Sequence, residues 1–207
     1  MKKIILLLCA ALLVIPSCKK AAPDADKDGN GAGNSQYSAE GVNAVDLGLS
    51  VLWADRNIGA ESPEDPGDFF AWGETTARGY NSFARPYIFD EAEAPAKLSG
   101  GYDTATALWG DGWRMPTKEE LLALGKLTRE EVKDTEGNII GYTVSGNGNN
   151  IHIPVVNPEA SSRSLALWSS ERGVSDPVWA YYFSMFGGGI ANCRREYAHA
   201  VRPVKAK

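Results

Sequence analysis

The sequence predicts an α+β domain with more strand than helix, preceded by a secretion signal and a flexible tether. Along residues 42–207, tryptophans, tyrosines and β-branched residues recur at short intervals, with Gly and Pro between them. A capping-box pattern at Thr117 and Glu120 marks one helix within this region. Its length of roughly 165 residues suits a single domain, which would bury about 70% of the surface of the unfolded chain.

Local patterns place the elements in the first half of the domain. Alternation of apolar and polar residues predicts two short strands, Val45–Leu47 and Val51–Ala54. A short helix is expected over 103–108, with Asp103 as its N-cap. The clearest helix is Thr117–Lys126, and its expected buried stripe consists of Leu121, Leu122 and Leu124.

The second half of the domain is expected to be mostly strand. Tyr142–Val144 and Ile151–Val155 flank a turn of Gly and Asn, and Trp179–Phe186 alternates clearly. A final strand is expected around Ala200–Val204. The alternation in Trp179–Phe186 predicts two faces, with Tyr181, Phe183 and Met185 on one and Ala180, Tyr182, Ser184 and Phe186 on the other.

Residues 1–17 have the layout of a lipoprotein signal peptide. Two lysines precede an apolar run, Ile4–Ile15, which as a helix would span about 18 Å, against about 30 Å for a hydrocarbon core. The residues Pro16, Ser17 and Cys18 that follow resemble the looser lipoboxes of Bacteroidota lipoproteins. We expect cleavage before Cys18 and lipidation of that residue, and an ordinary cleaved signal is the alternative.

Residues 18–41 are expected to form a lipidated, flexible tether, because they contain few large apolar groups. Asp24–Gly29 matches the start of a calcium-binding loop, but Ser35 stands where that loop needs Glu, and a solvated linker is the simpler interpretation. Loss of two lysines with the signal takes the formal charge from −5 to −7. Such an acidic chain is not expected to bind nucleic acid.

Five short markers follow one another along the domain. They are Val45–Val51 with the nearby Trp53, Ala54 and 57–60; Phe70–Thr75; Trp113–Thr117; Trp168–Ser170; and Val201–Val204. In this order they resemble the Fibrobacter succinogenes major paralogous domain family, which is common among Bacteroidota lipoproteins. The resemblance implies a C-type-lectin-like fold, in which the N- and C-terminal strands pair and two helices precede a small twisted antiparallel sheet.

The bulky residues of these markers suit structural roles. Trp72, Trp113 and Trp168 stand beside tight turns and are expected to be core anchors. Arg114 and Arg202 are each expected to hold loop carbonyls or a carboxylate such as Glu74 or Glu120.

The sequence gives no complete catalytic set. His152 and His199 lack metal-binding spacing, and the glycines at 187–189 suit a hairpin turn. Formylglycine-generating oxidases resemble this fold and share the Trp-Arg-Met-Pro-Thr segment, but their copper chemistry needs paired cysteines. The mature domain has one, Cys193, and no third group to orient His199 as its base. We expect no catalysis, cofactor or metal, and an oxidase-like enzyme is the remote alternative.

A ligand-binding surface is expected on the last sheet. The resemblance places contacts there, on the surface that varies in relatives diversified by retroelements. Aromatic, Asn and Arg side chains give contact area and hydrogen bonds at low entropic cost. The expected outward residues are Tyr182, Ser184, Phe186, Asn192, Arg194, Tyr197 and His199, with Glu171, Arg172 and Trp179 as second-rank candidates.

The expected function is non-enzymatic ligand binding or adhesion by a cell-envelope lipoprotein. Acyl chains at Cys18 would hold it stably on a membrane surface, with the outer membrane as the expected location and either face open. The expected partner is a protein or a glycan. The alternative is an envelope-structural lipoprotein that contacts other envelope proteins without a dedicated ligand site.

Overall fold

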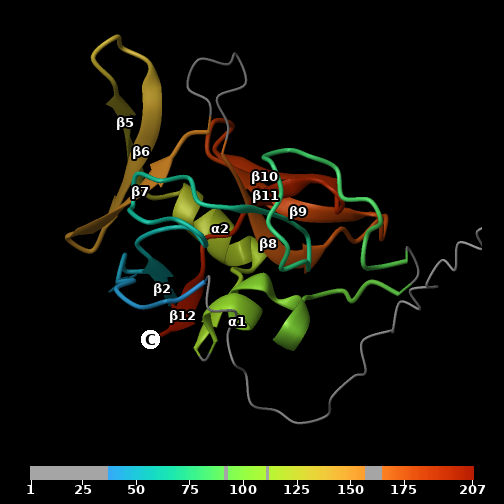
Figure 1. The fold of residues 1–207 in the computed structure, drawn as a ribbon. Helices are drawn as coiled ribbons and strands as arrows, with labels where there is room; N and C mark the ends of the chain where they lie inside the picture. Colours follow the sequence, from blue (N-terminus) through green and yellow to red (C-terminus); the bar gives the residue numbers. More distant parts are fainter. Residues whose placement is uncertain (1–36, 91–92, 111, 157–164) are drawn as a thin grey trace, which may run out of the picture. The chain divides into compact units, whose positions relative to one another are not determined.

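The computed structural model describes residues 37–90, 93–110, 112–156 and 165–207. These residues belong to one compact unit and form three small sheets and two α-helices (Figure 1). This confirms the expected strand-rich α+β class. The signal, Cys18 and the Asp24–Gly29 segment lie outside the described residues. Within the described part, no helix has the length and apolar character needed to cross a membrane.

The first sheet joins the start of the domain to its end. Its order is β1 (Ala44–Val45), β2 (Val51–Ala54), β12 (Val204–Ala206) and β4 (Trp113–Arg114), with β2 antiparallel to β12. The observed first strand ends at Val45, two residues before the predicted end at Leu47, because Gly48 turns the chain with a φ of +77°.

The second sheet carries the C-terminal half of the domain. Its order is β10 (Gly189–Arg194), β9 (Trp179–Ser184), β8 (Ala166–Arg172), β11 (Ala198–Ala200) and β3 (Phe69–Ala71). The 187–189 segment makes the predicted hairpin turn between β9 and β10. The expected single strand Ala200–Val204 is wrong: β11 and β12 belong to different sheets. Pro203, which has no N–H to donate to a ladder, lies between them.

The third sheet projects beside the other two at the upper left of Figure 1 and consists of β5 (Thr128–Lys133), β6 (Ile139–Gly146) and β7 (Asn149–Pro154). The β6–β7 turn is the predicted one, with positive φ at Asn147 and Gly148. The sequence did not predict β5. It is charged and exposed, so it has no apolar alternation to mark it, and such charge protects an edge strand from pairing with other chains.

Both predicted helices are confirmed, and so are their caps. The Asp103 carboxylate accepts hydrogen bonds from Thr106 N at the start of α1 (Thr104–Trp109) and from Met115 N. Thr117 and Glu120 exchange both capping-box bonds at the start of α2 (Lys118–Gly125). The expected stripe on α2 is wrong at one position. Leu121 and Leu124 are buried, but Leu122 lies about 100° further round the helix and is exposed.

Three expected core anchors, Trp72, Trp113 and Trp168, are buried. Trp72 donates its indole hydrogen to Ser169 O, and Trp168 donates to Phe70 O, so the two indoles cross-link β3 and β8. Tyr37 is also buried, where it packs edge-on against Phe70 and donates to Asp68. The folded region therefore extends beyond the predicted start at residue 42 into the segment expected to be tether.

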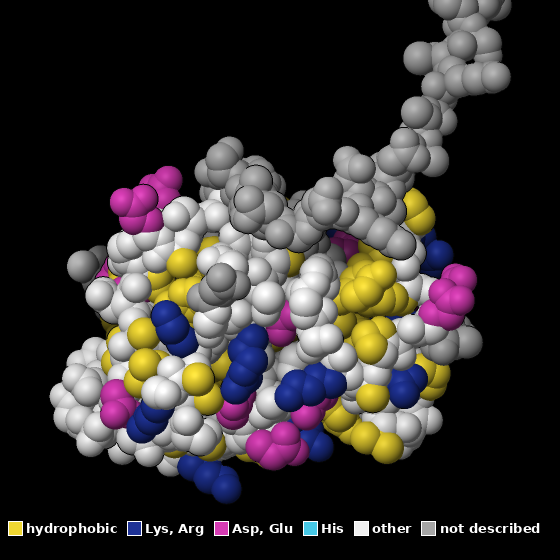
Figure 2. Space-filling view, turned by 90° about the horizontal axis from the view of Figure 1, so that it is seen from below, with side chains coloured by type: hydrophobic (Ala, Val, Ile, Leu, Met, Phe, Trp, Pro, Cys, Tyr) yellow, Lys and Arg dark blue, Asp and Glu magenta, His cyan; other side chains and the backbone are white. Residues whose placement is uncertain are grey.

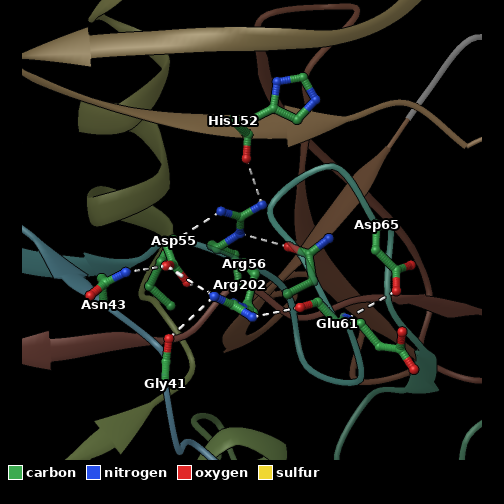
Figure 3. A network of polar contacts seen from close by, with 10 residues as sticks. Gly41, Asn43, Asp55, Arg56, Glu61, Asp65, His152 and Arg202 are labelled. Carbon is green, nitrogen blue, oxygen red and sulfur yellow. Dashed lines mark hydrogen bonds and ion pairs between the residues drawn. The ribbon is translucent and has the colours of Figure 1, made fainter.

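Two arginines perform the structural roles expected of them. Arg114 forms a two-pronged ion pair with Glu120 at 2.8 and 2.6 Å. Arg202 is fully buried and donates to Asn57 Oδ1 at 2.7 Å, Ala54 O at 3.1 Å and His152 O at 2.9 Å (Figure 3). Arg202 thus fixes β2, the loop after it and β7 to the C-terminal segment.

A second arginine, Arg56, makes further contacts close to Arg202. Arg56 donates to both oxygens of Asp55, and to the carbonyls of Gly41 and Glu61 (Figure 3). Burial raises the pKa of Asp55, but hydrogen bonds from Arg56 and Asn43 outweigh it and leave that pKa below its ordinary value. The carboxylate therefore stays charged beside the two guanidinium groups.

We predict that Arg202→Lys lowers the free energy of unfolding by about 3 kcal/mol. A lysine keeps the charge, but its donors all lie on one nitrogen and cannot reach acceptors that Arg202 contacts through Nε, Nη1 and Nη2, so buried acceptors lose their partners. Urea unfolding of the signal-free chain with Cys18→Ser measures the loss. Arg85→Lys, at an exposed position, is the matched control and should change stability by at most about 0.5 kcal/mol. Equal stability of the two variants would refute the role of Arg202.

Candidate functional site: a groove beside the last sheet

The second sheet has two differently covered faces. On one face, α2 packs against Phe183 of β9, so closely that a Cβ on Gly125 would lie 2.5 Å from the Phe183 ring. On the other face, Trp168, Tyr182 and His199 form an aromatic cluster, with ring centroids 4.5–6.2 Å apart. Near the N-terminus of α2 this first face is open, and there it carries Tyr181 and Trp179 of β9.

Two adjoining hollows lie in this region, with volumes of about 370 and 190 Å³. They share Gly173, Val174 and Tyr181, and together we call them the Trp179 groove. Val174 and Trp179 are large apolar side chains on its rim, exposed by 84% and 36%. The remaining lining residues are Ala96, Lys97, Lys118, Glu119, Glu171 and Arg172 in the first hollow and Ser175, Asp176 and Asn192 in the second.

Backbone contacts hold the walls of the groove in place. Gly173 N donates to Trp179 O at 2.7 Å, and Trp179 N donates to Asp176 O, so the loop between β8 and β9 closes on itself. The Asp176 carboxylate also accepts from Val178 N. On the opposite wall, Glu171 accepts from Lys118 N at the start of α2. The rim is therefore preorganised, which lowers the entropic cost of ligand binding.

The seven residues expected to share one outward surface are divided among several places. Asn192 is exposed, pairs with Tyr181 across the β9–β10 ladder and lines the Trp179 groove. Arg194 forms an ion pair with Glu196 at 2.8 Å, and its guanidinium also lies 5.7 Å from the ring of Phe83. Tyr197 packs edge-on against that same ring, with centroids 5.2 Å apart.

The other four expected contacts lie away from the groove. Ser184 accepts from Gly187 N in the β9–β10 turn, and Phe186 is exposed beside it by 63%. Tyr182 is half-buried in the aromatic cluster. The expectation that His199 faces outward is wrong, since only 5% of it is exposed. Strand alternation identified two faces but carried no information about which neighbours cover each one.

All three second-rank candidates line the groove: Glu171 and Arg172 in the first hollow and Trp179 in the second. The sequence does not predict Tyr181 as a site residue, because strand alternation places it on the same face as the buried Phe183 and Met185. That face is correct, but Tyr181 is only partly buried and lines both hollows. At the first residue of α2, the Lys118 ammonium lies 4.8 Å from the Tyr181 ring.

Cys193 and His199 come together, with Sγ and Nε2 3.2 Å apart. Burial raises the pKa of the Cys193 thiol to about 12 and lowers the pKa of His199 to about 4. Both groups are therefore neutral at pH 7, whereas a cysteine nucleophile needs its thiolate. The second ring nitrogen, Nδ1, is buried and has no partner among the described residues.

Acidic side chains outside the groove form hydrogen bonds with neighbouring residues. The Asp65 carboxylate accepts from the backbone N–H groups of Glu61 and Gly67. Over the described ranges, no three His, Cys, Asp or Glu side chains are grouped so as to hold a metal ion. On the face in Figure 2, acidic and basic side chains are interspersed with hydrophobic ones, so neither sign of charge forms a continuous patch there.

Comparison of the chain with protein-family models, with curated proteins and with solved structures finds no match.

We predict that His199 makes the fold acid-sensitive. Because its pKa is about 4 when folded and about 6.5 when unfolded, the unfolded state gains the proton first as the pH falls. Its contribution to stability is complete above pH 6.5 and lost between pH 6.5 and 4, by roughly 3 kcal/mol in all.

Urea unfolding of wild type and His199→Gln at pH 7, 5.5 and 4.5 tests this prediction. The variant should lose much of the pH dependence in this range. His152→Gln is the matched control: burial lowers the pKa of His152 as well, but that side chain is only half-buried, so the flattening should be smaller. An unchanged profile in His199→Gln would contradict the assignment.

Proposed function

We propose that this chain is a lipid-anchored protein of the cell envelope whose folded domain binds a ligand in the Trp179 groove. The observation that carries the proposal is the exposure of Val174 and Trp179 on the rim of a hollow, on a loop held by its own hydrogen bonds. Exposed aromatic groups beside polar ones are typical of binding sites. The proposal keeps the ligand on the last sheet and keeps Asn192, but it replaces Tyr182 and Phe186 with Tyr181 and with Trp179, a second-rank candidate.

The C-type-lectin-like fold and membership of the major paralogous domain family belong to this proposal. Three features support them: the pairing of β2 with β12, the presence of α1 and α2, and the antiparallel strands β8–β9–β10 near the end of the chain. Each is what the resemblance implies. The five sequence markers contribute β2, β3, β4 and β8 and the segment before β12.

A non-enzymatic role is part of the proposal as well. The neutral, buried state of Cys193 and His199 supports it, because that pair is not activated for nucleophilic attack. The alternative, an envelope-structural lipoprotein, draws support from the projecting third sheet, where Ile140 is exposed by 36% (Figure 1).

We predict that Trp179→Ala abolishes ligand binding by the soluble chain. A glycan and protein array probed with the signal-free Cys18→Ser chain identifies hits, and the variant should lose them because truncation removes the rim of the groove. Phe186→Ala is the matched control, since it removes an exposed aromatic residue outside the groove. If Phe186→Ala loses a hit that Trp179→Ala keeps, the site lies at the β9–β10 turn. If no hit appears, the envelope-structural role takes precedence.

We predict that Cys18→Ala releases the chain from membranes. Without acyl chains the lipid anchor is lost, and within the described residues no helix could span a membrane in its place. Membrane fractionation and palmitate labelling of wild type and variant in a Bacteroidota host measure the effect. Cys193→Ala is the matched control and should stay labelled and membrane-bound. Labelling that persists in Cys18→Ala would place the lipid elsewhere.

A further inference from the structure

We infer that the ligand of the Trp179 groove is an acidic saccharide, with its anionic group in the first hollow and a sugar ring against Trp179 in the second. The inference rests on the proposed function, because it concerns the same groove. It goes further in naming the chemical class that the two ends of the groove fit.

The first hollow presents cations. Lys97, Lys118 and Arg172 line it together with two carboxylates, Glu119 and Glu171. Both carboxylates are engaged locally: Glu171 accepts from Lys118 N at 3.1 Å, and Glu119 lies 3.7 Å from the Lys118 ammonium. Within the described part of the chain, Lys97 and Arg172 form no ion pair with a carboxylate. Lys97 helps to lower the pKa of Glu120 through its charge, and a carboxylate or sulfate of a ligand would supply a directly paired partner for both cations.

Backbone contacts fix the positions of the two segments that carry Lys97 and Arg172. Lys97 bridges to Glu171 across an isolated antiparallel pair, and Arg172 N donates to Ala96 O at 3.0 Å. The two cationic residues are therefore held on adjacent backbone segments that hydrogen-bond to each other. A guanidinium and an ammonium presented together suit an anionic oxygen group better than a neutral one.

The second hollow presents rings and hydroxyl-binding groups. Trp179 and Tyr181 supply aromatic surface, which the apolar face of a sugar ring can cover. Asn192 is exposed, and its amide both donates and accepts hydrogen bonds. Asp176 adds a carboxylate acceptor. Alternating donors and acceptors beside an aromatic surface match the hydroxyls of a saccharide, whereas a simple aliphatic acid would leave them unused.

The two hollows share the lining residues Gly173, Val174 and Tyr181, so one ligand that passes over these residues can reach both. A Cβ on Gly173 would lie 3.2 Å from Asp176 O and from Trp179 Cβ, so the loop is tightly packed at the junction. The anionic group and the ring of the ligand must therefore be connected at a fixed spacing. Neighbouring sugar residues of an acidic oligosaccharide meet this requirement.

The test compares tetragalacturonate with its methyl ester, which keeps the rings but loses the charges, by isothermal titration of the signal-free Cys18→Ser chain. A chondroitin sulfate tetrasaccharide provides a sulfated probe, and tetraglutamate an acidic peptide. We expect at least one acidic saccharide to bind, with affinity that falls as salt rises. Methyl esterification should weaken galacturonate binding by about tenfold or more.

Variants assign each end of the groove. Lys97→Gln with Arg172→Gln should reduce binding of the acidic saccharide about tenfold, and Trp179→Ala should abolish it. Lys126→Gln, an exposed cation at the other end of α2, is the matched control and should bind as wild type does.

Three results would overturn the inference. Equal affinity for the acid and the ester, or for tetraglutamate, would show that charge or saccharide chemistry is not what the groove recognises. Binding only of neutral array ligands, lost in Trp179→Ala, would leave the proposed function standing without this inference. The absence of any ligand sensitive to Trp179→Ala would remove both.

Discussion

The buried guanidinium of Arg202 is the interaction on which the arrangement of the sheets depends. It lies between β11, which belongs to the second sheet, and β12, which belongs to the first, and it donates to His152 O in the third. Burial lowers its pKa, and the negative charge of Asp55 opposes that shift. A planar group with three separate nitrogens can reach three acceptors from separate segments at once, whereas the donors of a lysine all lie on one nitrogen and an apolar side chain has none.

With the ends of the domain fixed in this way, the second sheet is anchored mainly through indoles. Trp72 and Trp168 fill the core with apolar area, and each also donates to a buried carbonyl across β11, between β3 and β8. This double role explains why bulky aromatic residues stand beside tight turns in this chain, since a buried carbonyl at a strand end needs a donor. Neither indole takes part in the outer end of β9, which presents the side chains of Trp179 and Tyr181 to the two hollows.

The sequence predicted best what depends on neighbours along the chain. The capping box at Thr117, the cap at Asp103 and the Asn147–Gly148 turn were all found, because each is encoded within a few residues. Features that depend on contacts between residues far apart in the sequence were predicted less well. The residues next to Leu122, Tyr181 and His199 in the sequence do not indicate which segment packs over each side chain. The division of 198–206 into two strands was likewise missed, because the partners of those strands come from the first half of the domain.

The position of the groove follows from the length of α2. This helix has eight residues, and it covers the second sheet near Phe183 through Gly125, the last of them. Its first residue, Lys118, places its ammonium 4.8 Å from the Tyr181 ring, where both residues line the first hollow. The same capping box that begins α2 at Lys118 therefore also sets the edge of the open surface. One more turn at that end would place side chains over Tyr181 and close the first hollow, so the residues that define the helix start also define the site.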